Sequence, residues 1–480
     1  MMLTRMTTSR WAAAMIVAAG MLSLAPVAAG DDPPRELTVS PAAEPTPVLR
    51  YRLMPAPAER RAGKAAPIYF RAMVLLGQRV SWRGDGLPAG DVGDRERVRH
   101  WLDADLHDLP IDEVRQLLNN YSEVFAEIDH AARHERADWQ PRLSEGIHAL
   151  LPELGQMRAL ARLTALRARV AIQQGALDEA IAALRTGYAM SEHMGELPVL
   201  LGSHVAWSIA LMMASVTEEL IAAEHAPNLY WALASRRDAT ANLRAAIATD
   251  RRVIYMMAPE LERLPTTPLP RAEADRLWAM TFEAWATDVD LTNPLAATSV
   301  GLLMYPRARE RLLERGVDPD HVEAMPVKQA LLHYWLEEFE HWADEMVKWS
   351  YLPYTEAIEP LGRSEDEMVD AALRGAVANP FLHSFISVSA AFGTGARTQH
   401  RFALLRAIEA IRMHVAETGT LPDALAEVTV VPVPTDPITG EPFAYERDGD
   451  TFTLKSAEPT RAHGTHERAG VRVRVRAVRP

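Results

Sequence analysis

The sequence predicts a mainly α-helical protein, in which helical hairpins pack into an irregular bundle or solenoid-like body and a small α+β module follows at the C-terminal end. Three observations predict this fold class. Apolar residues recur in steps of three and four along much of the chain, which is the period of a helix with one buried face. Glycine and proline residues separate these runs. Near the end of the chain, two short segments flank Asp448-Gly449, a strong signal for a β-hairpin.

The clearest helical hairpin spans residues 157–194. Apolar residues at helical spacing precede Gly175, and a second run of them follows it. Gly175 suits the left-handed position that ends a helix, and Asp178 and Glu179 suit the positive end of the next helix. Two amphipathic helices joined in this way must pack against each other and against further elements.

This hairpin resembles one tetratricopeptide unit. The match lies in its second half: Gly175, Leu177, Asp178-Glu179-Ala180-Ile181, Leu184 and Gly187. The first half departs from the family, because Thr164 and Arg167 occupy positions of large apolar residues, and no second copy follows at the family's period of about 34 residues. The resemblance implies a helical surface that binds peptides; an independent hairpin with a glycine turn is the alternative.

The N-terminus has the pattern of a secretory signal peptide over residues 1–29. Arg5 and Arg10 precede an apolar run that ends in Val27-Ala28-Ala29, a small-residue cleavage site. We therefore expect a periplasmic or extracellular protein with no membrane span after cleavage; an uncleaved anchor is the alternative. The sequence contains no cysteine, which excludes a lipoprotein anchor, disulfides and zinc–thiolate sites.

Composition and motifs assign no catalytic, cofactor-binding or metal-binding residue. The formal net charge of −13 makes the chain a poor candidate for binding nucleic acid. The sequence has no H-E-x-x-H, G-x-S-x-G or Walker lysine pattern. Three E-x-x-H pairs could place a metal ligand pair on one helix face, but we interpret them as exposed helix-surface residues: Glu127/His130, Glu145/His148 and Glu338/His341.

Composition divides the chain into four parts after the signal peptide. Residues 30–62 are rich in proline and alanine and predict an extended linker, with a short strand possible at 49–53. A helical domain follows at 63–265, an aromatic-rich helical subdomain at 266–380, and the C-terminal module at 381–480. Within the helical domain we expect one helix over 111–135 and a very apolar, buried helix that begins after Pro198.

The string Pro227-Asn228-Leu229-Tyr230-Trp231-Ala232-Leu233 resembles a family of uncharacterised exported proteins from planctomycete bacteria. The resemblance covers roughly residues 48–265 and implies an exported, mostly helical protein. It implies no activity and no site residues. Physically, Pro227 begins a short helix whose Tyr230 and Trp231 are expected to pack against the body.

The aromatic-rich part contains a heptad seam. Trp335, Phe339, Trp342 and Trp349 follow one another at steps of four, three and seven, so we expect them to be mostly buried, with Trp278 and Trp285 facing them. A ligand-binding aromatic groove is the alternative. Residues 318–370 carry 14 acidic and 3 basic residues, which predicts a solvated acidic face or, alternatively, a cation-binding surface.

The C-terminal module resembles the globular end of the major pseudopilins of type II secretion. The match consists of a helix, the turn Gly419-Thr420-Leu421-Pro422, the run from Asp436 to Tyr445, and a hairpin that ends at Ser456. The sequence lacks the family's N-terminal prepilin peptidase site. The segment that begins at Ser456 also departs from the family's calcium-binding S-x-G-x-D-G pattern. The alternating residues 471–476 predict a solvated edge strand with one basic face.

These observations predict an exported, non-enzymatic scaffold or protein-interaction protein of the cell envelope. The hairpin's first helix carries the arginines expected to bind an acidic segment of a protein partner: Arg158, Arg162, Arg167 and Arg169. The alternative is an exported hydrolase or metal-dependent enzyme with an unrecognised site. A deep cleft with clustered carboxylates and histidines would favour that alternative.

Overall fold

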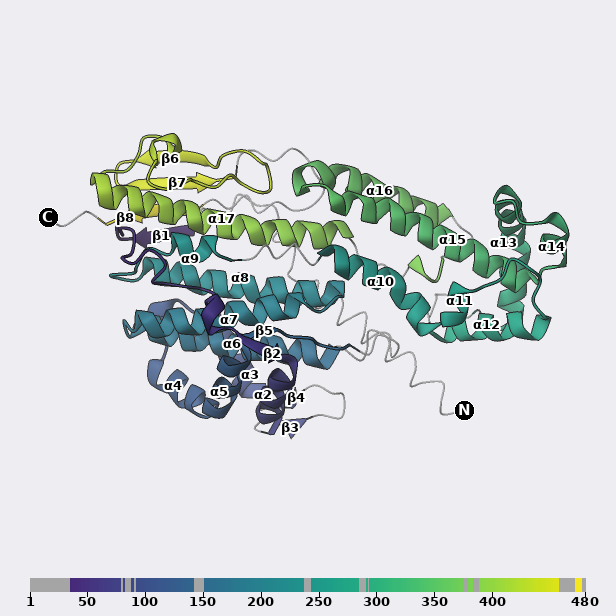
Figure 1. Cartoon of the computed structure of the whole chain (residues 1–480), viewed down its shortest axis with the longest axis horizontal. Coiled ribbons are helices and arrows are strands. Elements are labelled where there is room, and N and C mark those ends of the chain that lie inside the picture. Colours follow the sequence, from purple (N-terminus) through teal and green to yellow (C-terminus); the bar gives the residue numbers. More distant parts are fainter. Residues whose placement is uncertain are drawn as a thin grey trace.

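The computed structural model describes residues 35–78, 81–82, 88–89, 92–141, 151–236, 243–284, 291, 293–374, 379–382, 388–456 and 471–476. Within them the chain is mainly α-helical and carries a small sheet near its C-terminal end, as predicted. Figure 1 shows an elongated molecule: a helical body bears the sheet, and a second group of helices extends from it. The predicted signal peptide lies outside the described residues.

The body is built from both ends of the chain. Its N-terminal elements are β1 (Arg35–Val39), β2 (Arg61–Lys64), α2 (Ala66–Gln78), β3 (Ser81–Trp82), β4 (Pro88–Ala89), α3 (Val92–Asp103), α4 (Ile111–Asn119), α5 (Ser122–Ala131), β5 (His134–Arg136), α6 (Leu151–Gln173), α7 (Leu177–Gly195), α8 (Leu200–Ala222) and α9 (Tyr230–Ala234). Its C-terminal elements are α17 (Val388–Thr418), β6 (Ala444–Asp448), β7 (Thr451–Lys455) and β8 (Val471–Val475).

The prediction of one helix over 111–135 is wrong, because the structure has two helices there, α4 and α5. The backbone leaves helical geometry at Tyr121 (φ −108°, ψ 18°), between α4 and α5. The Tyr121 ring is buried, so packing of this residue into the core accompanies the break.

The predicted hairpin at Gly175 is confirmed. Gly175 adopts a φ of +70°, the left-handed conformation that costs glycine little. Its N–H donates to the Ile172 carbonyl, and the Ala176 N–H donates to the Ala171 carbonyl. This pair of hydrogen bonds is the Schellman motif, which satisfies the last carbonyls of α6 and reverses the chain into α7.

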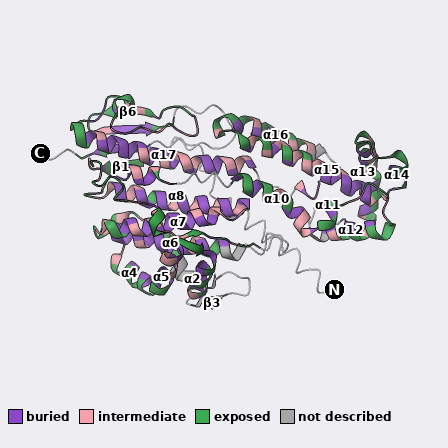
Figure 2. Ribbon diagram, in the orientation of Figure 1, coloured by how far each residue is buried: buried purple, intermediate pink, exposed green. Residues whose placement is uncertain are grey.

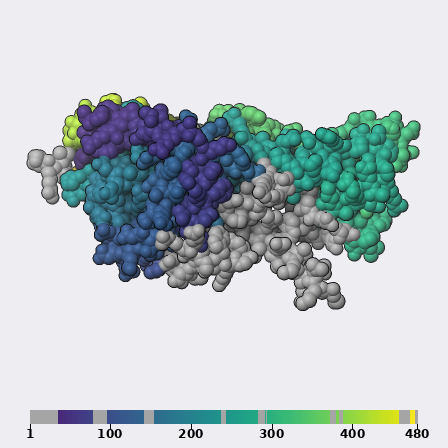
Figure 3. Space-filling view, turned by 60° about the horizontal axis from the view of Figure 1, so that its bottom comes forward, coloured from purple at the N-terminus to yellow at the C-terminus, as the bar shows by residue number. Residues whose placement is uncertain are grey.

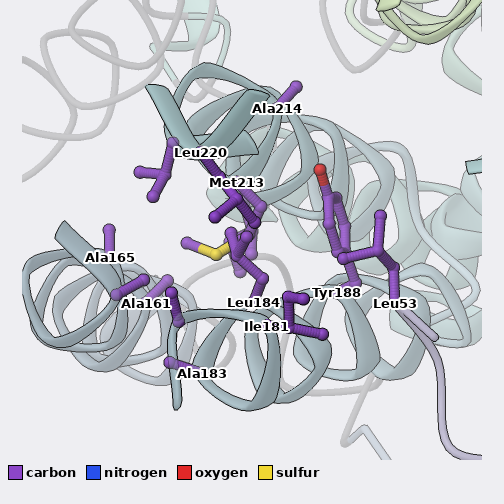
Figure 4. Packing of buried hydrophobic residues seen from close by; sticks show 14 of the residues in the cluster. Leu53, Ala161, Ala165, Ile181, Ala183, Leu184, Tyr188, Met213, Ala214 and Leu220 are labelled. Carbon is purple, nitrogen blue, oxygen red and sulfur yellow. The ribbon is translucent and has the colours of Figure 1, made fainter. Parts of the chain in front are cut away.

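Helices α6, α7 and α8 form the centre of the body (Figure 4). Gly187 of α7 lies against Met213 of α8, and a Cβ at this position would come within 2.1 Å of the Met213 sulfur. Glycine therefore allows these two helices to approach closely. Ala161 and Ala165 of α6, Ala183 of α7 and Ala214 of α8 are buried small residues of the same three-helix centre.

Helix α8 is the buried apolar helix that the sequence predicted. Among the described residues it is the one helix whose length and composition would suffice to cross a membrane, and 67% of its most apolar window is buried inside the fold. Helices α6, α7, α10 and α17 surround it. Figure 2 shows buried residues along most of α8 and α17.

The sheet joins the two ends of the described chain in the order β1-β8-β7-β6. Strand β1 pairs in parallel with β8, from Arg35 opposite Val471 to Val39 opposite Val475. Figure 3 shows the purple N-terminal residues beside the yellow C-terminal ones. The prediction that the 471–476 strand lies at a sheet edge is wrong, because β8 pairs with β1 on one side and with β7 on the other. Its valines are buried and its arginines are exposed. The possible strand at 49–53 does not form, and the strand lies at Arg35–Val39 instead.

The predicted C-terminal hairpin is confirmed, with its turn shifted by one residue. Asp448 pairs with Thr451, so the two loop residues are Gly449 and Asp450. Gly449 has a φ of +60°, and glycine at the first loop position suits a type II′ turn.

A buried polar junction ties the N-terminal segment to α9 and α17. Arg412 of α17 is fully buried and donates to the carbonyls of Ser40 and Ala226 and to the carboxylate of Glu409. Asn228, in the string before α9, donates to the Glu409 carbonyl and accepts from the Tyr230 N–H. Burial raises the pKa of Glu409, although Arg412 opposes this rise.

The second group of helices consists of α10 (Leu243–Met257), α11 (Pro259–Glu262), α12 (Arg271–Ala284), α13 (Pro294–Glu314), α14 (Pro319–Ala324), α15 (Val327–Val347) and α16 (Tyr354–Arg374), with a short 3-10 turn η6 (Lys348–Tyr351) between α15 and α16. The described residues form three hydrophobic cores, of which the smallest joins residues of α8, α10, α15, α16 and α17. The main core combines residues from 39 to 233 with residues from 403 to 475, and the second core holds residues from 254 to 381. Local composition could not show this division, because the body forms by packing α17 and the sheet onto the N-terminal helices.

The heptad seam is confirmed for its first half. Trp335 and Phe339 are fully buried, whereas Trp342 and Trp349 are only half-buried. Trp278 faces Trp335 as predicted, with ring centroids 5.6 Å apart. The predicted partner Trp285 lies outside the described residues.

Trp335→Ala should lower the free energy of unfolding by about 3–5 kcal/mol, because removal of a fully buried indole leaves a cavity. Trp335→Phe should cost less, since phenylalanine fills most of the space and the Trp335 Nε1–H has no hydrogen-bond partner in the described part of the chain. Urea unfolding measures both values. Trp342→Ala should cost less than Trp335→Ala, and equal costs would contradict this account.

Candidate functional site

The prediction of partner-binding arginines on α6 is wrong for Arg169. Arg169 is buried, with a side chain only 2% exposed. Its guanidinium donates to the backbone carbonyls of Trp101, Leu102 and Ala104 and pairs with Glu219 of α8. These carbonyls end α3, so Arg169 caps that helix and is inaccessible to a partner.

The other three arginines lie in different environments. Arg167 binds Asp129 of α5 at 2.9 Å and lies over the Phe125 ring, on another side of α6 from Arg169. Arg158 and Arg162 are half-buried. Burial lowers the pKa of Arg158. A helix that is surrounded by α3, α5 and α8 sends its long side chains to different neighbours, which the linear spacing did not reveal.

The E-x-x-H pairs have structural partners in the described residues. Glu127 binds Arg71, and Glu338 accepts a hydrogen bond from Asn379. Glu145 and His148 lie outside the described residues. Within the part of the chain that the structure describes, no group of three or more histidine, aspartate or glutamate side chains could hold a metal ion.

A cavity of about 480 Å³ lies where α9, α17 and residues 434–437 meet, and we call it the arginine groove. Arg236 and Arg406 line it, and none of its described lining residues is acidic. Its other lining residues are Leu233, Ala234, Thr398, Gln399, Phe402, Ala403, Pro434, Thr435 and Pro437. The groove thus combines two cations with an apolar wall, in a protein whose formal net charge is −13.

Arg236 is held between two aromatic rings. Its guanidinium carbon lies 3.5 Å from the centroid of Phe402 and 4.2 Å from that of Tyr188. The two rings fix the plane of the guanidinium through cation–π contacts. Its Nε and Nη1 atoms are buried and have no hydrogen-bond partner among the described residues. Burial lowers the pKa of Arg236, because leaving water disfavours the charged form.

Arg406 is oriented by Tyr230. Its guanidinium carbon lies 5.2 Å from the Tyr230 ring centroid, and its Nη2 donates to the Tyr230 hydroxyl at 3.2 Å. That hydroxyl donates in turn to the Pro432 carbonyl at 2.6 Å. The Arg406 Nε is buried without a partner in the described residues. An N–H of a buried cation that lacks a partner costs free energy.

The loop wall of the groove is fixed by Asp436, whose side chain is fully buried. Its Oδ1 lies 2.9 Å from His400 Nδ1 and accepts from the Ile438 N–H, while its backbone pairs with Gly440 and Glu441. Burial alone would raise the pKa of Asp436, but the hydrogen bond and charge of His400 outweigh it, so the pKa lies below its ordinary value.

A second cavity, of about 500 Å³, continues from the groove, and we call it the aromatic pocket. The two cavities share Gln399, Thr435 and Pro437. Tyr351, Tyr354 and Phe392 provide the aromatic lining of the pocket, together with Arg244, Leu352 and the buried Asp436. The groove and the pocket thus lie next to each other along α17.

Sequence reasoning missed both groove arginines. Arg236 follows the predicted helix at Tyr230, and Arg406 lies within the predicted C-terminal helix, yet neither belongs to a motif. They are 170 positions apart in the chain. The aromatic partners Tyr188, Tyr230 and Phe402 offered no signal either, because helical spacing marks them as core residues.

Arg169→Gln should lower the free energy of unfolding by about 3–5 kcal/mol, because it leaves buried carbonyls and Glu219 without their cation. Arg115→Gln, on the exposed face of α4, should change it by less than about 0.5 kcal/mol. Chemical denaturation measures both values. A stable Arg169→Gln protein would mean that this arginine is not structural.

Because the pKa of Asp436 is lowered, we expect the stability that this side chain gives to residues 434–437 to be lost in acid. A carboxylate with a depressed folded-state pKa stabilises the fold above its unfolded pKa, and this stability is lost as the pH falls below 3.8 toward the folded-state value. Asp436→Asn should therefore be less stable at neutral pH and lose less stability in acid than the parent protein. Glu441→Gln, an exposed neighbour, is the control. Parallel pH profiles for parent and Asp436→Asn would refute the assignment.

Comparison with known proteins gives no relative from which a function could be transferred. No protein-family model matches the chain, and no curated protein or solved structure shows significant similarity to it. The function must therefore be inferred from the residues of the groove.

Proposed function

We propose that the protein is a non-enzymatic binding protein of the cell envelope that holds an acidic segment of a partner protein in the arginine groove. The observation that supports this most is the pair Arg236 and Arg406, whose buried N–H groups have no acceptor among the described residues. The cavity volume of about 480 Å³ falls within the range of ligand sites.

The charge distribution supports an anionic ligand. Two guanidinium groups line the groove, and none of the described residues that line it carries a carboxylate. Carboxylates form strong, geometrically defined hydrogen bonds with arginine, so an aspartate or glutamate side chain suits both cations. The apolar wall of Leu233, Phe402 and Pro434 would pack against the neighbouring residues of the segment.

The wider features of the chain agree with this role. The predicted signal peptide would export the protein, and the resemblances of the Gly175 hairpin and of the C-terminal module are to units that bind other proteins. We thus assign the partner-binding role to Arg236 and Arg406 in place of the arginines of α6.

The hydrolase alternative would use another cavity, of about 840 Å³, between α10 and α15. It is lined by Glu337, Glu340 and His333, a combination that could perform acid–base chemistry. Each of these groups has a structural partner: Arg315 binds Glu337, Arg251 binds Glu340, and the Pro265 carbonyl lies 2.8 Å from His333 Nε2. Because each of these groups already binds another part of the protein, we interpret them as a structural charge network. We therefore favour the binding function over the hydrolase alternative.

The test uses labelled, capped octapeptides that contain two adjacent glutamates among prolines and alanines, with matched glutamine peptides as controls. The glutamate peptide should bind more tightly by about tenfold or more, because one charged hydrogen bond contributes about 1.5–3 kcal/mol. Fluorescence anisotropy at low and high salt measures this difference, which should shrink as salt screens the charges.

Arg406→Gln should remove most of the preference for glutamate, whereas Arg115→Gln should leave it unchanged. Thermal melting of both variants establishes that they are folded. Equal binding of the glutamate and glutamine peptides by the parent protein would reject the proposed function. So would a preference that survives in Arg406→Gln.

A further inference from the structure

The aromatic pocket has features that the arginine groove lacks. Tyr351 and Leu352 are 65% and 39% exposed, so an apolar surface lies open at its rim. The Tyr354 ring stacks on Phe392, with centroids 6.1 Å apart and an interplanar angle of 25°. Such a lining favours another flat apolar ring, through offset or edge contacts.

Arg244 adds a cation to the aromatic lining of this pocket. Its guanidinium carbon lies 5.2 Å from the Tyr351 ring centroid, and its Nε donates to the Ser350 carbonyl at 3.0 Å. The buried carboxylate of Asp436, which lines the same pocket, opposes a second carboxylate there. The pocket is therefore suited to a ring, and the groove to a carboxylate.

The separation of the two cavities can be derived from α17. The aromatic pocket contacts this helix between Phe392 and Gln399, and the arginine groove contacts it between Thr398 and Arg406. The centres of these ranges are Ala396 and Phe402, six residues apart, or about 9 Å at the helical rise of 1.5 Å per residue.

In an extended peptide, one spacing between two anchor residues matches this separation of about 9 Å. In a polyproline II segment, residues three apart lie on the same side, because the helix has three residues per turn, and they are about 9 Å apart at about 3.1 Å per residue. In a flat β-strand, residues two and four apart share a side, at about 7 and 13 Å. The distance along α17 thus favours a spacing of three.

We propose that the partner segment of the arginine groove is an extended, polyproline II-like stretch in which an acidic residue occupies the groove and an aromatic residue three positions away occupies the aromatic pocket. This inference rests on the proposed function and adds the second anchor and its spacing. The charge complementarity of the groove and the exposed Tyr351 surface at the pocket rim support the same occupant.

The experiment uses capped, proline-rich peptides with one glutamate and one tryptophan at spacings of one to five residues, and a peptide with alanine in place of tryptophan. The spacing of three should bind at least about fivefold more tightly than the alanine peptide. Spacings of one and five should gain little, because the ring then cannot reach the pocket. Fluorescence anisotropy measures the series.

Tyr351→Ala tests the pocket itself. Because Tyr351 is mostly exposed, its removal should leave the fold intact. The variant should lose the gain from tryptophan at spacing three but bind the alanine peptide as the parent does. Val369→Ala, an exposed apolar residue of α16, is the matched control and should retain the gain.

The outcomes separate the two proposals. If glutamate peptides bind but tryptophan adds nothing at any spacing, the second anchor is wrong and the proposed function stands. The same conclusion follows if Tyr351→Ala weakens all peptides equally. If no glutamate peptide binds, both proposals fail.

Discussion

The buried ion pair between Arg412 and Glu409 is the interaction on which the body depends. A buried cation is tolerated only where its N–H groups find acceptors, and here the backbone carbonyls of Ser40 and Ala226 complete the set. These acceptors come from the N-terminal segment and from the chain before α9. One guanidinium therefore fixes three segments that are far apart in the sequence, and the parallel pairing of β1 with β8 extends the same connection.

The position of the arginine groove follows from this junction. Asn228 binds the Glu409 carbonyl and also accepts from the Tyr230 N–H, so the start of α9 is held against α17. Tyr230 then reaches the Pro432 carbonyl and Arg406. The groove walls are thus joined by a chain of hydrogen bonds, and the cations in it are held in place before a ligand arrives. Such preorganisation lowers the entropic cost of binding.

The arginines of this protein differ in whether their N–H groups find acceptors. Arg169 and Arg412 each bind backbone carbonyls and one glutamate, so each connects separate elements inside the fold. Arg236 and Arg406 are held by aromatic rings, which fix their direction and leave buried N–H groups without acceptors in the described residues. Aromatic rings position a guanidinium without using all of its hydrogen bonds, and this property is why we propose Arg236 and Arg406 as the binding residues.

The sequence by itself determined the local features of this protein: its helical class, the glycine turn at 175, the buried apolar helix α8 and the hairpin before Ser456. These follow from periodicity and from glycine conformation, which act over a few residues. The tertiary structure alone decided that β1 joins the C-terminal sheet, that Arg169 is buried, and that Arg236 and Arg406 share one groove. Such contacts join positions far apart in the chain, and no local pattern records them, because their energy arises only when these distant elements pack together.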